Sequence, residues 1–146
     1  MKYHEEKMDL LNVPQGWWLA HCISADFALG AGVAKQINEA FNMREMLKEE
    51  VNNQFPFDGV VLPGTCVIIG NVYNLVTKEK YYHKPTLGTL ELSLRQMRRH
   101  AMRHKIKKIA MPKIGCGLDR LNWDDVKLLI QEIFKDTDIE IMVCYL

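Results

Sequence analysis

Short apolar runs of strand length alternate along this chain with longer segments that have helical periodicity. The strand-length runs occupy residues 17–23, 66–69, 72–77, 108–114 and 139–143. Apolar side chains recur three and four positions apart, as on one face of an amphipathic helix, within residues 33–51, 87–101 and 126–134. Strands that alternate with helices predict a layered α/β domain with a mixed central sheet.

Turn and capping residues separate these segments. Gly70-Asn71 stands between two strand-length runs and predicts a two-residue hairpin. Thr86 and Asn122 each precede a helical pattern and are predicted N-caps, and Pro85 keeps the helix after Thr86 from extending backward. Residues 52–63 contain two prolines and a glycine and are predicted as a loop.

The size and charge of the chain suit one ordinary domain. Its 146 residues are enough to bury a sizeable core, so we expect a single domain over residues 1–146, and a monomer. Hydrophobic residues make up 48%, which argues against disorder. The net charge of +1 does not indicate a strongly basic nucleic-acid binder, although local clusters can hide in such a total.

No segment has the length of a membrane span or the apolar core of a secretory signal, so we expect a cytoplasmic protein without membrane contact. The four cysteines lie far apart, and none forms the CxxC pair typical of zinc sites: Cys22, Cys66, Cys116 and Cys144. We therefore expect reduced thiols, most of them buried, and no metal site.

Two glycine-containing segments follow predicted strands, where α/β sheets bind their ligands. The first glycine loop is residues 29–33, with Gly30-Ala31-Gly32 before a predicted helix, and the second glycine loop is residues 115–118. Lys35 stands where the dinucleotide fingerprint needs its third glycine, so that fingerprint is absent. Either loop alone is consistent with a plain strand-to-helix turn, whereas two such loops on one sheet favour a diphosphate ligand.

Three residues near these loops are candidates for chemistry. Lys84, before Pro85, would be a nucleophile if its amine lost its proton, although most lysines are simply solvated. Asp119 follows the second glycine loop and suits a general acid or base, or else a residue at the entry to the next helix. Cys116 is more readily interpreted as a buried structural thiol than as a nucleophile.

Basic side chains gather within 14 positions of the predicted third helix and the segment after it: Arg95, Arg98, Arg99, Arg103, Lys105, Lys107 and Lys108. This basic stripe would suit nucleic-acid phosphates. It shares a helix with the apolar face of residues 87–101, so a solvated helix face is the favoured interpretation.

Three longer motifs resemble those of the macrodomain family, in particular its branch of terminal ADP-ribose protein glycohydrolases. They are residues 20–24 with Asp26 and 30–34, then residues 83–86 (HKPT), and residues 111–121 (MPKIGCGLDRL) followed by Trp123. The resemblance runs from about residue 9 to residue 146. It implies a three-layer α/β/α macrodomain whose diphosphate-containing ligand, ADP-ribose, lies between the two glycine loops.

The resemblance also assigns roles to particular residues. Asp9 matches the acid that holds the adenine amino group, although Met8 replaces the usual glycine before it, and Ser24 and Asp26 match positions near the distal ribose. The ADP-ribose-binding residues that it implies are Asp9, Leu10, His21, Ser24, Asp26, Gly30, Ala31, Gly32, Val33, Pro85, Thr86, Ile114, Gly115, Cys116, Gly117, Leu118 and Leu146.

Lys84 and Asp119 would form the catalytic pair of that branch, and no cofactor is implied. Lys84 would attack the anomeric carbon of the distal ribose, and Asp119 would act as acid/base to resolve the lysyl adduct. His21-Cys22-Ile23-Ser24 stands where other hydrolytic macrodomains have asparagines, which favours this lysine mechanism over one that uses water alone. The family removes ADP-ribose from Glu or Asp side chains and deacylates O-acetyl-ADP-ribose, so ADP-ribose or an ADP-ribosylated protein is the expected partner.

Other functions remain open from the sequence. A catalytically silent ADP-ribose reader would share the binding loops. Antitoxin-type relatives remove ADP-ribose from DNA bases, and the basic stripe is the specific feature that favours ADP-ribosylated nucleic acid. An unrelated hydrolase that uses the Cys116 thiol is the least favoured alternative.

Overall fold

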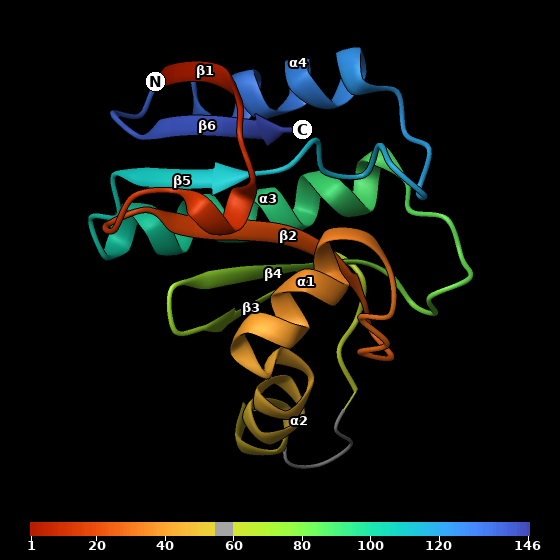
Figure 1. Ribbon diagram of the computed structural model, residues 1–146. Coiled ribbons are helices and arrows are strands. Elements are labelled where there is room, and N and C mark those ends of the chain that lie inside the picture. Colours follow the sequence, from red (N-terminus) through yellow and green to blue (C-terminus); the bar gives the residue numbers. More distant parts are fainter. Residues whose placement is uncertain (55–59) are drawn as a thin grey trace.

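Six strands form one mixed sheet, and helices cover both of its faces (Figure 1). The computed structural model describes residues 1–54 and 60–146. The strand order is β1-β6-β5-β2-β4-β3. The strands are β1 (Lys2–Lys7), β2 (Trp18–Ser24), β3 (Cys66–Ile69), β4 (Val72–Lys78), β5 (Lys108–Met111) and β6 (Glu140–Tyr145).

Five of the six strands run in the same direction. Strand β1 pairs parallel with β6, β6 with β5, β5 with β2, and β2 with β4, whereas β3 pairs antiparallel with β4. The carboxyl ends of β1, β6, β5, β2 and β4 therefore meet at one edge of the sheet. Loops that leave this edge are the expected place for a ligand in such a fold.

Each face of the sheet has its own hydrophobic core. The short helix η1 (Leu10–Asn12), α1 (Gly32–Phe41) and α2 (Met43–Gln54) cover one face, with Leu10, Ile37 and Leu47 buried there. Helices α3 (Leu87–Arg103) and α4 (Trp123–Phe134) cover the other face, with Leu94 and Ile130 buried there. This arrangement confirms the expected three-layer α/β/α architecture.

Several local predictions are confirmed. Ile69 pairs with Val72, so Gly70-Asn71 is a two-residue hairpin loop. Thr86 accepts a hydrogen bond from the Thr89 backbone N–H and caps α3, and Asn122 caps α4 in the same way. Among the described residues, no helix has the length and apolar character needed to cross a membrane.

Two predicted elements are shorter than expected. The single helix predicted over residues 33–51 is two helices, because Asn42 adopts a left-handed conformation with φ 53° between α1 and α2. Asparagine tolerates that conformation better than most residues, and Asn38 accepts a hydrogen bond from the Arg44 backbone N–H across the break. The strand predicted over residues 108–114 ends at Met111, since Pro112 has no N–H for the sheet.

One strand, β1, was not predicted from the sequence, and one loop begins later than predicted. Four of the six residues of β1 (KYHEEK) are charged and another is a histidine, so the strand has no apolar pattern by which to recognise it. It is an edge strand held by β6 on one side, where such residues are tolerated. Helix α2 continues to Gln54, into the loop predicted over residues 52–63. Residues 55–59 of that prediction lie outside the described part of the chain, and residues 60–63 have neither helix nor strand.

Candidate active site

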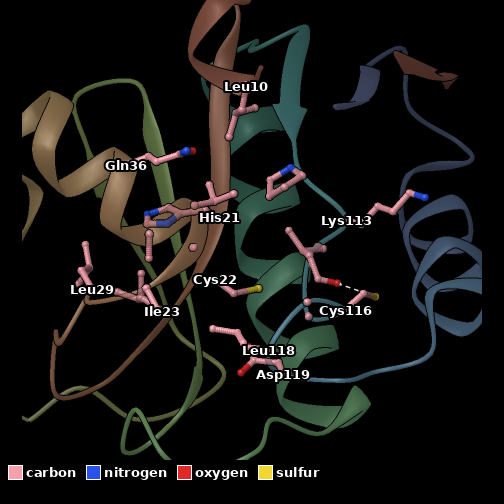
Figure 2. A pocket seen from close by; sticks show the side chains of 18 of the residues that line it. Leu10, His21, Cys22, Ile23, Leu29, Gln36, Lys113, Cys116, Leu118 and Asp119 are labelled. Atoms are coloured by element: carbon pink, nitrogen blue, oxygen red, sulfur yellow. Dashed lines mark hydrogen bonds between the residues drawn. The ribbon is translucent and has the colours of Figure 1, made fainter. Parts of the chain in front are cut away.

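One cavity of about 940 Å³ lies at the carboxyl edge of the sheet. It is lined by residues at or after the ends of all five parallel strands, from Met8 after β1 to Leu146 after β6. Figure 2 shows how side chains from β2 and from both glycine loops surround this single space. Its size and mainly apolar walls with a few polar groups are typical of a small-molecule site.

The first glycine loop leads directly into α1. Gly32 begins the helix with φ +58°, and a Cβ built on it would meet no atom within 4 Å. The loop therefore needs glycine there for its backbone conformation, and open space remains above it. The first turn of α1 has backbone N–H groups without helical partners, and these groups together with the helix dipole favour an anion.

Arg44 of α2 supports the segment before this loop. Its guanidinium donates to the carbonyl oxygens of Phe27, at 3.0 Å, and Ala28. Ala28 and Leu29 line the cavity, so a contact from the second helix fixes the backbone that leads to the first turn of α1.

The second glycine loop is a tight turn held by its own backbone. The Leu121 N–H donates to the Gly115 carbonyl at 2.7 Å, and the Arg120 N–H donates to the Gly117 carbonyl at 3.2 Å. Gly115 has φ +74°, and a Cβ built on it would come within 2.8 Å of the Leu121 side chain. Both glycine loops line the same cavity, so the two loops that were predicted to hold a diphosphate face one space.

Lys84 and Asp119 come from segments far apart in the sequence and both line the cavity. The Lys84 amine donates to the Leu118 carbonyl oxygen at 2.9 Å, next to Asp119 in the chain. Asp119 Oδ1 accepts a hydrogen bond from Lys78 Nζ at 2.5 Å. The structure therefore brings the predicted catalytic pair to one wall of the site and adds a second lysine there.

Ser24 lines the cavity and is held by Asp26 behind it. The Ser24 hydroxyl donates to Asp26 Oδ1 at 2.5 Å, and Asp26 also accepts from the backbone N–H groups of Ala28 and Tyr81. Burial raises the pKa of the Asp26 carboxyl, but these three hydrogen bonds and the charge of Lys80 outweigh it, so that the pKa is lower than usual. Asp26 thus ties the start of the first loop to the segment that carries Lys84.

His21 forms part of the cavity wall as a neutral side chain. It is buried, and burial lowers its pKa to about 4, although its hydrogen bond with Asn74 acts in the opposite direction. Asn74 Nδ2 donates to the Val67 carbonyl, which leaves Asn74 Oδ1 to accept from His21 Nε2 at 2.5 Å. The imidazole is therefore fixed in one orientation between β2 and β4.

Three cysteines line the cavity, and all of them favour the thiol form. Burial raises the pKa of Cys22 to about 12 and that of Cys144 to about 11. It also raises the pKa of Cys116. The Cys116 thiol donates to the Ile114 carbonyl at 3.2 Å (Figure 2, dashed line). Because the thiolate is the nucleophilic form, these surroundings support the structural interpretation of Cys116.

Most of the residues expected from the sequence to bind ADP-ribose line this cavity. Those that do so, besides Lys84 and Asp119, are Asp9, Leu10, His21, Ser24, Gly30, Ala31, Gly32, Val33, Ile114, Gly115, Cys116, Gly117, Leu118 and Leu146. The other three are not among the lining residues. Asp26 lies behind Ser24, Pro85 is buried, and the Thr86 side chain caps α3. Lining the cavity places a residue at the site, and the ADP-ribose-binding roles of all seventeen residues stay predictions.

Several lining residues were not identified from the sequence. Lys78 is the last residue of β4, and its position at the carboxyl end of a strand could have indicated that it lines the site. Tyr81 and Tyr82 lie at the mouth of the cavity with 65% and 67% of their surface exposed. Lys113 Nζ lies 5.3 Å from the centre of the Tyr145 ring, a cation–π contact between two strand ends.

The basic stripe is not at the cavity. Helix α3 starts beside the carboxyl edge, after β4, and leads to the amino end of β5, so its last residues lie at the opposite edge of the sheet. Arg95 and Arg98 form ion pairs with Glu91 and Asp136, and Lys107 pairs with Asp138. These contacts support the solvated-face interpretation. Among the described residues, no three His, Cys, Asp or Glu side chains gather as a metal site would require.

This chain is similar to known proteins in both sequence and fold. The family model described as Macro domain matches residues 20–130, most of the chain. The human protein named ADP-ribose glycohydrolase OARD1 is 37% identical over 142 residues, which cover 94% of this chain and 87% of that protein. The chain therefore belongs to the macrodomain family, as its motifs indicated.

Two further matches come from Thermus aquaticus. The solved structure of the macrodomain of its DarG protein has a TM-score of 0.83 and 22% identity and covers 99% of this chain and 97% of that one. A protein named DNA ADP-ribosyl glycohydrolase from the same species is 25% identical over 80% of this chain, which corresponds to 34% of that longer protein. The structural likeness concerns the fold.

Proposed function

We propose that this chain is an ADP-ribosyl hydrolase that removes ADP-ribose from acidic side chains of proteins, with Lys84 as the nucleophile and Asp119 as the acid/base. One observation carries the proposal: Lys84 and Asp119 line the same cavity as the two glycine loops. The relationship to a protein named ADP-ribose glycohydrolase, at 37% identity, supports the same reaction class.

The cavity suits the parts of ADP-ribose in order. Backbone N–H groups of the first glycine loop and the start of α1 would hold the diphosphate opposite the second glycine loop. Asp9 and Leu10, after β1, would contact the adenosine end. Ser24 and Lys84 would face the distal ribose: both line the cavity, and Asp26 joins the Ser24 hydroxyl to the backbone N–H of Tyr81, three residues before Lys84.

The chemical step would be nucleophilic substitution at the anomeric carbon. The Lys84 amine forms a C–N bond to that carbon while the C–O bond to the substrate carboxylate breaks, and Asp119 accepts the proton that the amine loses. Asp119 then returns a proton as water hydrolyses the adduct and frees ADP-ribose and Lys84. An acyl ester on the same ribose would lie within reach of these groups, so the proposal includes deacylation of O-acyl-ADP-ribose.

The test is release of ADP-ribose from a glutamate-linked mono-ADP-ribosylated protein by the wild type, by Lys84→Ala and by Lys80→Ala. Lys80 belongs to the same segment but does not line the cavity, so it is the matched control. We expect Lys84→Ala to lose release and to keep binding of free ADP-ribose in calorimetry, with Lys80→Ala unchanged. Binding without release by all three proteins would instead indicate a reader.

ADP-ribosylated DNA is a second candidate substrate, favoured by the similarity to the protein named DNA ADP-ribosyl glycohydrolase. The basic stripe does not support it, because the stripe lies at the other edge of the sheet. A modified oligonucleotide offered to the same three proteins separates the two substrates. If DNA is a substrate bound at the cavity alone, neutralising Arg98, Arg99 and Arg103 together will leave its release unchanged.

A further inference from the structure

The ion pair between Lys78 and Asp119 is unusually well shielded for this chain. The two side chains are 14% and 17% exposed, and their N–O distance is 2.5 Å. Surface pairs such as Lys107–Asp138, with side chains 54% and 70% exposed, are of the kind that contributes little to stability. A shielded pair that lines the cavity has more effect on the groups around it, because water screens it less.

Two lysines from one short segment hold two consecutive residues of the loop that faces them. Lys78 ends β4 and binds the Asp119 carboxylate, whereas Lys84, six residues later, donates to the Leu118 carbonyl. The carboxylate charge is thus matched by Lys78, and the contact of Lys84 is with an uncharged acceptor. An ammonium group bound to a carboxylate keeps its proton more firmly than one bound to a carbonyl.

We propose that Lys78 is a positioning residue that allows Lys84 to act as the nucleophile, an inference that rests on the function proposed above. Lys78 holds Asp119 through Oδ1, which leaves Oδ2 as the oxygen that accepts the proton from Lys84. It also prevents Asp119 from capturing the Lys84 ammonium in an ion pair that would block attack. The two lysines therefore have separate tasks, one on the acid/base and one on the substrate.

The titratable groups around this pair come from each element that faces it. Those that line the cavity with it are Cys22 from β2, Lys113 and Cys116 from the segment between β5 and α4, and Tyr81, Tyr82 and Lys84 from the segment after β4, whereas Lys80, His83 and Arg120 belong to the same segments but do not line the cavity. Cys22 and Cys116 are both affected by the charge of Asp119, and their raised pKa values keep them neutral near pH 7. The change expected on removal of Lys78 is therefore a change at Asp119 and its basic neighbours.

The experiment compares Lys78→Met, Lys78→Arg and the control Lys80→Met with the wild type. It measures kcat and KM for ADP-ribose release from pH 5.5 to 9.5. We expect Lys78→Met to lower kcat at pH 7 by about a hundredfold, the lower range for one positioned acid/base group, with KM changed little. The acid limb of its pH profile moves to higher pH, because Lys84 then pairs with Asp119. Lys78→Arg restores most of kcat, and Lys80→Met resembles the wild type.

Mass spectrometry of the quenched reaction adds an independent measurement. Lys84 that has formed the C–N bond gains the mass of ADP-ribose less one water, and peptide mapping locates this adduct. We expect it on Lys84 in the wild type and in Lys78→Arg, and much less of it in Lys78→Met. An adduct on Lys78 would make that residue the nucleophile and overturn the positioning role.

The remaining outcomes separate this inference from the function on which it rests. If the wild type and Lys80→Met are active and Lys78→Met matches them in kcat and pH profile, the inference alone fails. If neither the wild type nor Lys80→Met releases ADP-ribose, the proposed function fails and the inference with it. Should Lys78→Met not fold, Lys78→Gln, which can still donate to Asp119 without a charge, is compared with Lys78→Arg in its place.

Discussion

The two glycine loops face the same cavity but are supported in opposite ways. The second glycine loop is held from within its own short stretch of chain: the N–H groups of Arg120 and Leu121, directly after it, donate to the Gly117 and Gly115 carbonyls, and the Leu121 side chain leaves no room for a Cβ on Gly115. The first glycine loop has open space above Gly30 and Gly32, and the segment that precedes it is held from a distance, by Arg44 of α2. A change at Gly115 of the second loop should therefore act on stability, whereas a change in the first loop should act mainly on ligand binding.

The largest effect expected from this comparison is that of Gly115→Ala. The added Cβ meets Leu121 at 2.8 Å and the residue must keep φ +74°, so we expect a loss of about 2–3 kcal/mol in the free energy of unfolding. Urea denaturation measures it. Gly117→Ala is the control in the same loop, since a Cβ there meets nothing within 4 Å. Equal stability of the two variants would contradict the claim that the second loop is held from within.

Acid should weaken the strand that leads into the first glycine loop. The pKa of His21 is lowered to about 4, so the unfolded chain binds a proton between pH 6.5 and 4 that the folded protein does not. The free energy of unfolding that the neutral His21 contributes above pH 6.5 is lost as the pH falls, and the loss reaches about 2 kcal/mol at pH 5.

The measurement is urea denaturation at pH 7.5 and pH 5 for the wild type and His21→Gln. The amide of the variant can donate to Asn74 but does not titrate in this range. The wild type should lose more stability than the variant on acidification, and the difference isolates His21 from the carboxylates. Identical losses would show that the imidazole is not kept neutral by burial.

Removal of the external support of the first glycine loop should have a smaller effect on stability. Arg44→Met loses the hydrogen bonds to the Phe27 and Ala28 carbonyls, and we expect about 1–2 kcal/mol less stability. ADP-ribose affinity, measured by calorimetry, should fall as well, because those carbonyls precede the loop. Lys48→Met removes an exposed ion pair on the same helix and should leave both quantities unchanged.

The smallest effect on stability is expected for Gly30→Ala. The nearest atom to a Cβ built on Gly30 is the Ala28 carbonyl oxygen, at 3.9 Å, so the free energy of unfolding should change by less than about 0.5 kcal/mol. The added methyl group enters space that a diphosphate would occupy, and ADP-ribose binding should weaken. Unchanged affinity in calorimetry would place the diphosphate elsewhere.

The sequence predicted the parts of this fold that have a strong local pattern. Apolar runs identified five of the six strands, because strands that are buried on both faces need continuous apolar residues. They did not identify β1, whose charged residues are tolerated at a sheet edge. The break at Asn42 was missed because the apolar spacing continues across it while the backbone changes direction.

The residues of the candidate site that belong to sequence motifs could be predicted. Motif resemblance placed Lys84, Asp119 and the glycine loops together, and the structure brings them to one cavity. Lys78 has no local signal for its role, since its partner lies 41 residues away and only the packing of the β4 end against the second loop brings the two together. Pairings of this kind depend on tertiary structure, so local patterns do not contain them.

The lining of the cavity by segments from Met8 to Leu146 couples ligand binding to the integrity of the whole chain. A partly unfolded form that lacks any one strand end would have an incomplete site, so ADP-ribose would bind the native state alone. Ligand at a hundred times its dissociation constant would then add about 2.7 kcal/mol to the unfolding free energy. It would protect helices on both faces of the sheet from proteolysis to the same extent, including those that it never touches.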